Sequence, residues 1–141
     1  MATVNKNLSH YDKDSIPNGA DFKIGIVVSE WNDNITLNLL KGAEEALLEN
    51  GVKQENIHVH FAPGSFELPL ASQWLLEKED IDGVVAIGSV IQGETKHFDF
   101  VCDATAQGVK DVGLKYNKPA IFCVLTDNNL QQAVDRSGGK H

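Results

Sequence analysis

The sequence has few cysteines, few basic residues and no long hydrophobic run. Its two cysteines stand in different kinds of segment, Cys102 in a helical pattern and Cys123 in a β-rich run, so we expect two reduced thiols. Twelve basic residues against twenty acidic ones give a formal net charge of -8, which argues against a nucleic-acid partner. No segment has the pattern of a signal peptide or a membrane span, so we expect a cytoplasmic protein without a membrane partner.

The sequence also has little that points to a metal site. His58 and His60 share one face of a predicted strand, but no third ligand stands at a suitable spacing. A polar or interface face is the favoured interpretation of this pair, and we expect no bound metal.

Strand and helix patterns alternate along most of the chain. Residues 1–21 are polar and contain Pro17 and Gly19, which predicts an extended N-terminal arm, and residues 22–141 have the size of one domain. The hydrophobic patterns predict strands at 22–28, 57–61, 83–88 and 120–125, and helices at 35–48, 66–78, about 101–116 and 130–136. This order predicts an α/β fold with a parallel sheet and helices on both faces.

Finer expectations concern the helices. Asp33 or Asn34 is expected to cap the first helix and Gly51 to end it. Trp74 lies inside a helical pattern and is expected in the core, whereas Trp31 lies in a polar context and is expected to be exposed.

Polar residues gather just after each predicted strand, at 29–34, 63–67, 89–97 and 126–129. Ligands of open parallel sheets bind outside the carboxyl ends of the strands. Four loops at one edge of the sheet therefore predict one shared site.

The segment Gly-Ser-Val-Ile-Gln-Gly-Glu-Thr at residues 88–95 has the glycine spacing of a P-loop. Glu94 stands where that motif requires lysine, which excludes a nucleotide-triphosphate loop. A glycine-bearing turn before a helix can still offer backbone N–H groups to a single phosphate, with the Thr95 hydroxyl beside them. An ordinary tight connection between strand and helix is the alternative.

Four other side chains carry possible chemistry. His97, near this anion site, has the right chemistry for general acid–base catalysis, and a helix-start residue without a role is the equal alternative. Phe66 and Glu67 offer a ring and a carboxylate to a planar heterocycle, or serve only as a helix staple and a first-turn charge. Arg136 is either a helix-end charge or a phosphate ligand.

Four segments together resemble the lumazine synthase family in order and spacing. They are Ser-Glu-Trp-Asn at 29–32, Pro-Gly-Ser-Phe-Glu-Leu-Pro at 63–69, Gly-Ser-Val-Ile-Gln-Gly-Glu-Thr-Lys-His-Phe-Asp at 88–99 and Ile-Phe-Cys-Val-Leu-Thr at 121–126. The resemblance spans residues 22–140 and implies a three-layer, flavodoxin-like sandwich with a four-stranded parallel sheet. It also implies condensation of 5-amino-6-(D-ribitylamino)uracil with 3,4-dihydroxy-2-butanone 4-phosphate, the penultimate step of riboflavin biosynthesis, with no cofactor.

The resemblance assigns roles to individual residues. His97 becomes the general acid–base group, and Glu94, Thr95 and Arg136 the phosphate ligands. The remaining assigned residues bind the pyrimidine ring and the ribityl chain: Trp31, Asn32, Ser65, Phe66, Glu67, Ser89, Val90, Ile91 and Phe122.

The resemblance further implies a site shared between neighbouring subunits, with Phe122 and Arg136 reaching it from the adjacent chain. Pentamers, or an icosahedral shell of pentamers, are the implied assemblies, and the N-terminal arm is expected to pair with a neighbour. The family continues past residue 141 with a Gly-Asn-Lys-Gly stretch and an amphipathic helix. An impaired shell-forming or ligand-binding variant is therefore the alternative function, and a flavodoxin-like flavin binder is disfavoured by the composition of residues 29–34.

Overall fold

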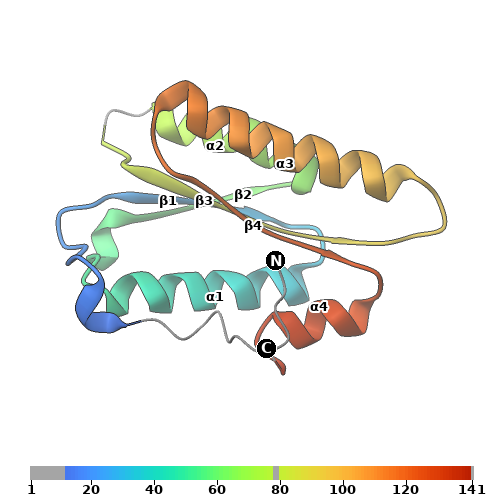
Figure 1. The fold of residues 1–141 in the computed structure, drawn as a ribbon, viewed down its shortest axis with the longest axis horizontal. Helices are drawn as coiled ribbons and strands as arrows, with labels where there is room; N and C mark the ends of the chain where they lie inside the picture. The colour runs from blue at the N-terminus through green and yellow to red at the C-terminus, as the bar shows by residue number, and fades with distance from the viewer. Residues whose placement is uncertain (1–11, 78–79, 141) are drawn as a thin grey trace.

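The computed structural model describes residues 12–77 and 80–140. A four-stranded sheet lies between two layers of helices (Figure 1). Its strands are β1 (Ile24–Ser29), β2 (Ile57–Ala62), β3 (Gly83–Ile91) and β4 (Ala120–Asp127), in the order β2-β1-β3-β4. All three pairs of neighbouring strands are parallel, which confirms the predicted three-layer α/β architecture.

The helices divide evenly between the two faces of the sheet. Helices α1 (Asp33–Glu49) and α4 (Leu130–Arg136) cover one face, and α2 (Leu68–Glu77) and α3 (His97–Tyr116) cover the other (Figure 1). Short 3-10 turns lie at Lys13–Ser15, Gln54–Asn56 and Ser65–Glu67.

The central strand β1 supplies both hydrophobic cores because successive side chains of a strand point to opposite faces. Val27 packs with α2 and α3, whereas Ile26 and Val28 pack with α1, and all three are fully buried. The continuous apolar run of this strand therefore reflects burial on both faces.

Strand β3 runs on to Ile91 and does not end at Gly88, so the predicted glycine-bearing turn beginning at Gly88 is wrong. Gly88 is a buried strand residue, and a Cβ there would lie 2.6 Å from Ser65 Oγ and 3.0 Å from Leu68 Cδ1. This glycine permits the close approach of the segment before α2. The connection between β3 and α3 is confined to residues 92–96.

Two expectations about helix contacts were also wrong. Neither Asp33 nor Asn34 caps α1, because the N-cap position is Asn32 and its side chain makes no capping hydrogen bond. Trp74 is 61% exposed, since α2 directs Leu75 and Leu76 toward the sheet and leaves Trp74 beside the edge strand β2. Gly51 does end α1, with a φ of 92°.

Only part of the predicted arm lies within the described residues. The Gly19 N–H donates to the Asn50 carbonyl at 2.7 Å, and the Lys13 ammonium lies 2.9 Å from the Glu49 carboxylate, so this part contacts the end of α1. The division into an arm at 1–21 and a domain at 22–141 stays a prediction. Pairing of the arm with a neighbour likewise stays a prediction, and residues 1–11 of the arm lie outside the described part.

Several further features bear on the expected site chemistry. Both cysteines are free, as expected, and burial raises the pKa of the Cys123 thiol above its ordinary value. Within residues 12–77 and 80–140, no group of three or more His, Cys, Asp or Glu residues could hold a metal. No helix of the described ranges is long and apolar enough to cross a membrane.

Candidate active site

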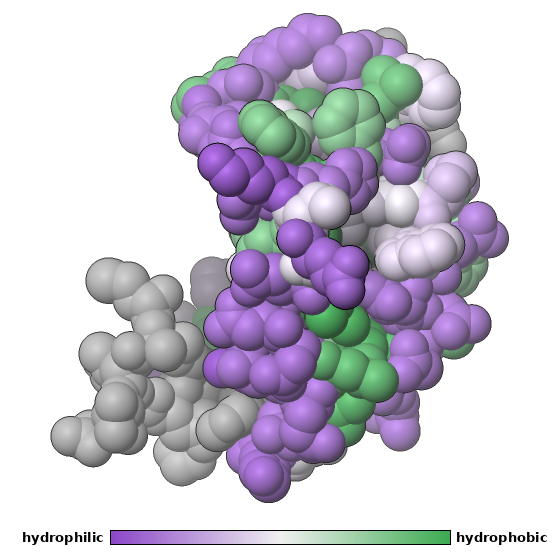
Figure 2. All heavy atoms as spheres, turned by 90° about the vertical axis from the view of Figure 1, so that its right-hand side faces the viewer, coloured by the Kyte–Doolittle hydropathy of each residue, from purple (hydrophilic) through white to green (hydrophobic). Residues whose placement is uncertain are grey.

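The strand order places a crevice between β1 and β3. The chain leaves β1 toward α1 on one face and leaves β3 toward α3 on the opposite face, so the two connections diverge (Figure 1). Such a switch point at the carboxyl ends of the strands is where open α/β sheets bind ligands. Figure 2 looks onto this edge, where residues of intermediate hydropathy gather across the middle of the face.

A cavity of about 410 Å³ occupies this crevice, within the usual size range of sites for small molecules. Three of the four predicted loops line it, namely those after β1, β2 and β3, whereas the loop after β4 does not. The residues that line the cavity are Trp31, Asn32, Gly64, Ser65, Phe66, Glu67, Ser89, Val90, Ile91, Gly93, Thr95, His97, Phe98 and Val101.

Most residues that the sequence nominated for the site therefore lie around one cavity. Glu94, Phe122 and Arg136 are the nominated residues that do not line it. Those that do are Trp31, Asn32, Ser65, Phe66, Glu67, Ser89, Val90, Ile91, Thr95 and His97.

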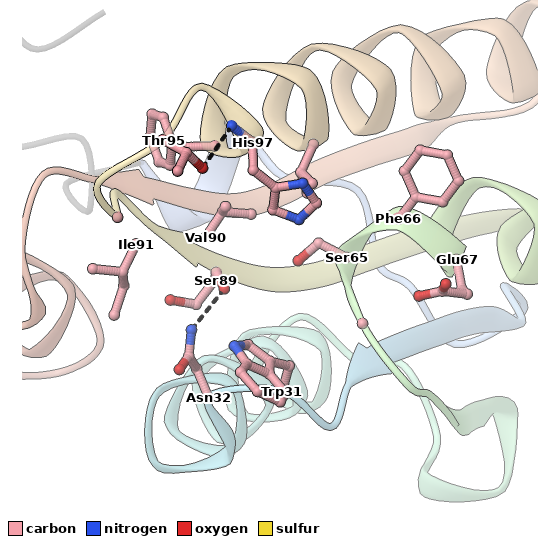
Figure 3. A pocket seen from close by; sticks show the side chains of 14 residues that line it. Trp31, Asn32, Ser65, Phe66, Glu67, Ser89, Val90, Ile91, Thr95 and His97 are labelled. Atoms are coloured by element: carbon pink, nitrogen blue, oxygen red, sulfur yellow. Dashed lines mark hydrogen bonds between the residues drawn. The ribbon is translucent and has the colours of Figure 1, made fainter.

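Trp31 and His97 lie on opposite walls of the cavity (Figure 3). The indole of Trp31 is 71% exposed, as expected, which leaves its face available to a planar ligand. His97 is the first residue of α3, and its backbone N–H donates to the Thr95 hydroxyl oxygen at 3.3 Å. This helix start directs the imidazole into the cavity (Figure 3).

The turn at Ser65–Glu67 forms a third wall. The Ser65 carbonyl accepts a hydrogen bond from the Thr105 hydroxyl at 3.1 Å, which anchors the turn to α3. Phe66 remains 62% exposed. The Glu67 carboxylate lies over Gly64, where a Cβ would be 3.1 Å from Oε2, so the glycine leaves space for that carboxylate.

The end of β3 forms the floor between these walls. Ser89 is 1% exposed, and its hydroxyl has no hydrogen-bond partner within the described residues. Its carbonyl accepts a hydrogen bond from Asn32 Nδ2 at 2.9 Å (Figure 3). A buried hydroxyl without a partner is costly, so a polar ligand group at this position would be favoured.

Sequence reasoning missed Gly64, Gly93, Phe98 and Val101 as lining residues. Val101 stands four residues after His97, the spacing that puts two helical side chains on one face. That spacing was the available signal for Val101. The two glycines lie within nominated segments, but only the folded loops show that they border the cavity.

Phe122 and Arg136 lie elsewhere on the chain. Phe122, on the edge strand β4, is 40% exposed and lines a separate depression against α3. Arg136 Nη1 donates to the Gln132 carbonyl at 3.1 Å and lies 3.6 Å from Asp127 Oδ1. No Lys or Arg of the described residues lines the cavity, so within that part of the chain a bound phosphate would have no Lys or Arg partner.

The family model described as 6,7-dimethyl-8-ribityllumazine synthase matches residues 21–141. The chain belongs to this family. The matched segment includes every residue that lines the cavity.

Relatives named 6,7-dimethyl-8-ribityllumazine synthase align over the whole chain. The relatives from Flavobacterium johnsoniae and Christiangramia forsetii are each 57% identical, and the chain covers 74% and 84% of their lengths, respectively. The relative from Cytophaga hutchinsonii is 52% identical, and the chain covers 88% of it.

Proposed function

We propose that this chain condenses 5-amino-6-(D-ribitylamino)uracil with 3,4-dihydroxy-2-butanone 4-phosphate to form 6,7-dimethyl-8-ribityllumazine, with release of phosphate and water. The observation that carries the proposal is the cavity, which belongs to a chain of this family and has Trp31 facing His97 across it. One wall suits a planar ring and the other carries a proton donor.

The pyrimidine substrate binds on the Trp31 side of the cavity. Its ring stacks on the exposed indole, and backbone groups of residues 89–91 bind its polar edge. Ser65, Phe66 and Glu67 contact the ring and the ribityl chain, whose hydroxyl groups suit a carboxylate and a serine, and Asn32 borders the same wall.

The phosphate binds at the loop of residues 92–96, before the N-terminus of α3. Gly93 and Thr95 line the cavity there, and the positive end of the helix dipole favours an anion. Glu94 contributes through its backbone, because its carboxylate would repel the phosphate. The Gln92 N–H donates to the Asp127 carbonyl at 2.8 Å, which ties the loop to β4.

Two exposed apolar surfaces at opposite edges of the sheet support a site shared between copies. The β2–α2 surface carries Phe61, Leu70 and Trp74, and the β4–α3 surface carries Leu114, Ile121 and Phe122. Different surfaces that bind each other give a head-to-tail contact, which closes into a ring when the rotation permits.

Glu67 lines both the cavity and the depression of the β2–α2 surface. A neighbour whose β4–α3 surface packs there therefore lies at the mouth of the cavity. We infer that Phe122 and Arg136 of that neighbour complete the site, and that Arg136 supplies the missing cation.

Homo-oligomeric assembly is a property of this family. Pentamers, or an icosahedral shell of them, and pairing of the N-terminal arm with a neighbour are the assembly we propose. A cytoplasmic location stays a prediction from the sequence.

The reaction requires positioning and proton transfer. The 5-amino group of the uracil attacks the ketone, water leaves as the Schiff base forms, phosphate is eliminated, and the ribitylamino nitrogen closes the ring with loss of water. His97 carries protons between the amine, the carbonyl oxygen and the leaving phosphate. Holding two substrates in one cavity supplies most of the acceleration, and no nucleophilic side chain is needed.

The test is to mix both substrates with the assembled protein and follow lumazine absorbance and fluorescence together with phosphate release. We expect lumazine and phosphate to appear in equal amounts. Absence of product from a properly assembled sample would contradict the proposal and favour an impaired variant that only binds ligands or assembles. The relatives, all named as the synthase, lend that alternative no support.

A further inference from the structure

The exposed indole of Trp31 raises the question of what holds it in place. With 71% of the residue exposed, packing against its own chain constrains the ring little. Its position must therefore come from the backbone of the β1–α1 connection. That backbone is fixed at two points before Asn32: the Glu30 N–H donates to the Ala62 carbonyl at 2.8 Å, and the Ser29 hydroxyl donates to the Trp31 carbonyl at 3.3 Å.

Asn32 has an uncommon backbone conformation. Its φ of 60° and ψ of 47° lie in the left-handed region, which only Asn117 shares among the non-glycine residues of the described chain. A side chain usually raises the energy of this conformation by about 1 kcal/mol, and asparagine tolerates it better than most residues. The conformation turns the chain directly after Trp31, and the Asn32 carbonyl accepts the first backbone hydrogen bonds of α1 from Ile35 and Thr36.

The Asn32 side chain makes a second connection. Pairing between β1 and β3 ends at Val28 and Ile87, so the carbonyl of Ser89 lies beyond the last residue pair of these two strands. Asn32 Nδ2 donates to that carbonyl at 2.9 Å, in a partly buried position. The amide thus takes the place of a strand residue after β1 has turned away, and it ties the Trp31 loop to the floor of the cavity (Figure 3).

We propose that Asn32 is a positioning residue that sets the spacing between the Trp31 indole and the backbone of residues 89–91. This spacing determines how well a planar heterocycle fits the cavity, so Asn32 acts on the pyrimidine substrate and not on the phosphorylated ketone. The assignment of that ring to this wall rests on the proposed function. The position has two requirements, a left-handed backbone and a side-chain N–H donor for the Ser89 carbonyl. Asparagine meets both.

Three substitutions separate these two requirements. Asn32→Gly keeps the backbone conformation and loses the side chain, Asn32→Asp keeps the size and loses the donor, and Asn32→Ala loses both the tolerance and the donor. Asn38→Asp is the matched control, because the Asn38 amide also donates to a backbone carbonyl, that of Asn34 at 3.1 Å, but on the exposed side of α1.

All variants carry Trp74→Phe, which leaves Trp31 as the single tryptophan and the sole indole reporter. In the ligand-free protein, we expect the fluorescence anisotropy of Trp31 to decay faster in all three Asn32 variants than in the Asn38→Asp control. With 6,7-dimethyl-8-ribityllumazine as the added probe, we expect half-maximal quenching of Trp31 in the three Asn32 variants to need a concentration about 10-fold higher than in the Asn38→Asp control. A 10-fold change is the equivalent of one lost hydrogen bond.

In turnover, the KM for the uracil substrate should rise about 10-fold, whereas the KM for the phosphorylated ketone should stay within about 2-fold. A merely structural role would raise both. An anisotropy in Asn32→Gly and Asn32→Asp equal to that of the Trp74→Phe background, or equal rises of both KM values, would overturn the inference. Failure of the proposed function would instead show as no product from the Trp74→Phe background and from wild type, and the ligand-free anisotropy would still decide the role of Asn32.

Discussion

His97 reaches into the cavity from the first turn of α3, opposite the exposed indole of Trp31 (Figure 3). We expect His97→Ala to lower kcat about 100-fold, because the proton carrier is lost while both substrates are still held in place. Both KM values should change little. Initial rates of lumazine formation measure this, with His97→Gln as a variant that keeps a hydrogen-bonding side chain but cannot transfer the proton. Unchanged kcat in either variant would remove His97 from its role.

Arg136 is held by the Gln132 carbonyl and lies near the buried carboxylate of Asp127. If a neighbour contributes it to the phosphate side of the cavity, Arg136→Ala should raise the KM for the phosphorylated ketone about 10- to 100-fold, the worth of charge-assisted hydrogen bonds. Lys41→Ala, which removes another exposed cation, is the control and should have no effect. An unchanged KM for the ketone would argue against Arg136 as a phosphate ligand.

Replacement of glycine by alanine is expected to have opposite effects on stability in β3 and in α1. Gly88 in β3 has no room for a Cβ beside Ser65 and Leu68, whereas Gly42 in α1 has nothing within 4 Å of that position. We expect Gly88→Ala to reduce the free energy of unfolding by about 1–3 kcal/mol through overpacking. Gly42→Ala should increase it by about 0.5–1 kcal/mol through helix propensity. Urea unfolding at one protein concentration measures both, and effects of the same sign would contradict this account.

The contact between α2 and α3 has a pH dependence of predictable sign. Hydrogen bonds from the Tyr116 hydroxyl at 2.6 Å and from Gln73 hold the pKa of the Glu77 carboxyl below its ordinary value. A carboxyl with a lowered pKa in the folded state stabilises the fold above its unfolded pKa, and this stabilisation is lost as the pH falls through the folded pKa.

Tyr116→Phe should therefore reduce stability at neutral pH and make the loss of stability on acidification less steep. The urea midpoint, measured from about pH 7 to about pH 3, should differ between wild type and variant at neutral pH and converge at the acid end. Glu77→Gln provides the control, since it removes the titrating group itself. Parallel curves for wild type and Tyr116→Phe would show that the hydrogen bond contributes nothing to the pH dependence.

The elements themselves were largely predictable from the sequence. Buried parallel strands and amphipathic helices have distinct periods, so the order of strands and helices and the edge that carries the site followed from the pattern. The end of β3 did not, because Ser89 and Gly88 look like turn residues and only the partner strand β4 shows that they continue the ladder. The role of Asn32 was equally hidden, since its side chain donates a hydrogen bond to Ser89, a residue far along the chain.

At the scale of the whole molecule, the proposed contact between copies would account for the wrong prediction for Trp74. A hydrophobic residue in a helix pattern is typical of a core position, but a surface that binds another copy has the same pattern. Phe61 and Trp74 are both more than half exposed at the β2 edge, and Phe122 is exposed at the β4 edge. The pattern of one chain cannot separate burial within a chain from burial between chains.

In the proposed function, the cavity is one part of a site that a second copy completes. Its test uses His97→Ala and Arg136→Ala chains that are dissociated, mixed in equal amounts and reassembled. If the two residues of a site come from different chains, about one site in four regains both. At a ketone concentration below the wild-type KM, where each variant alone is slow, the mixture should then recover about a quarter of the wild-type rate, far above either variant alone. Activity equal to the mean of the two separate variants would contradict the shared site.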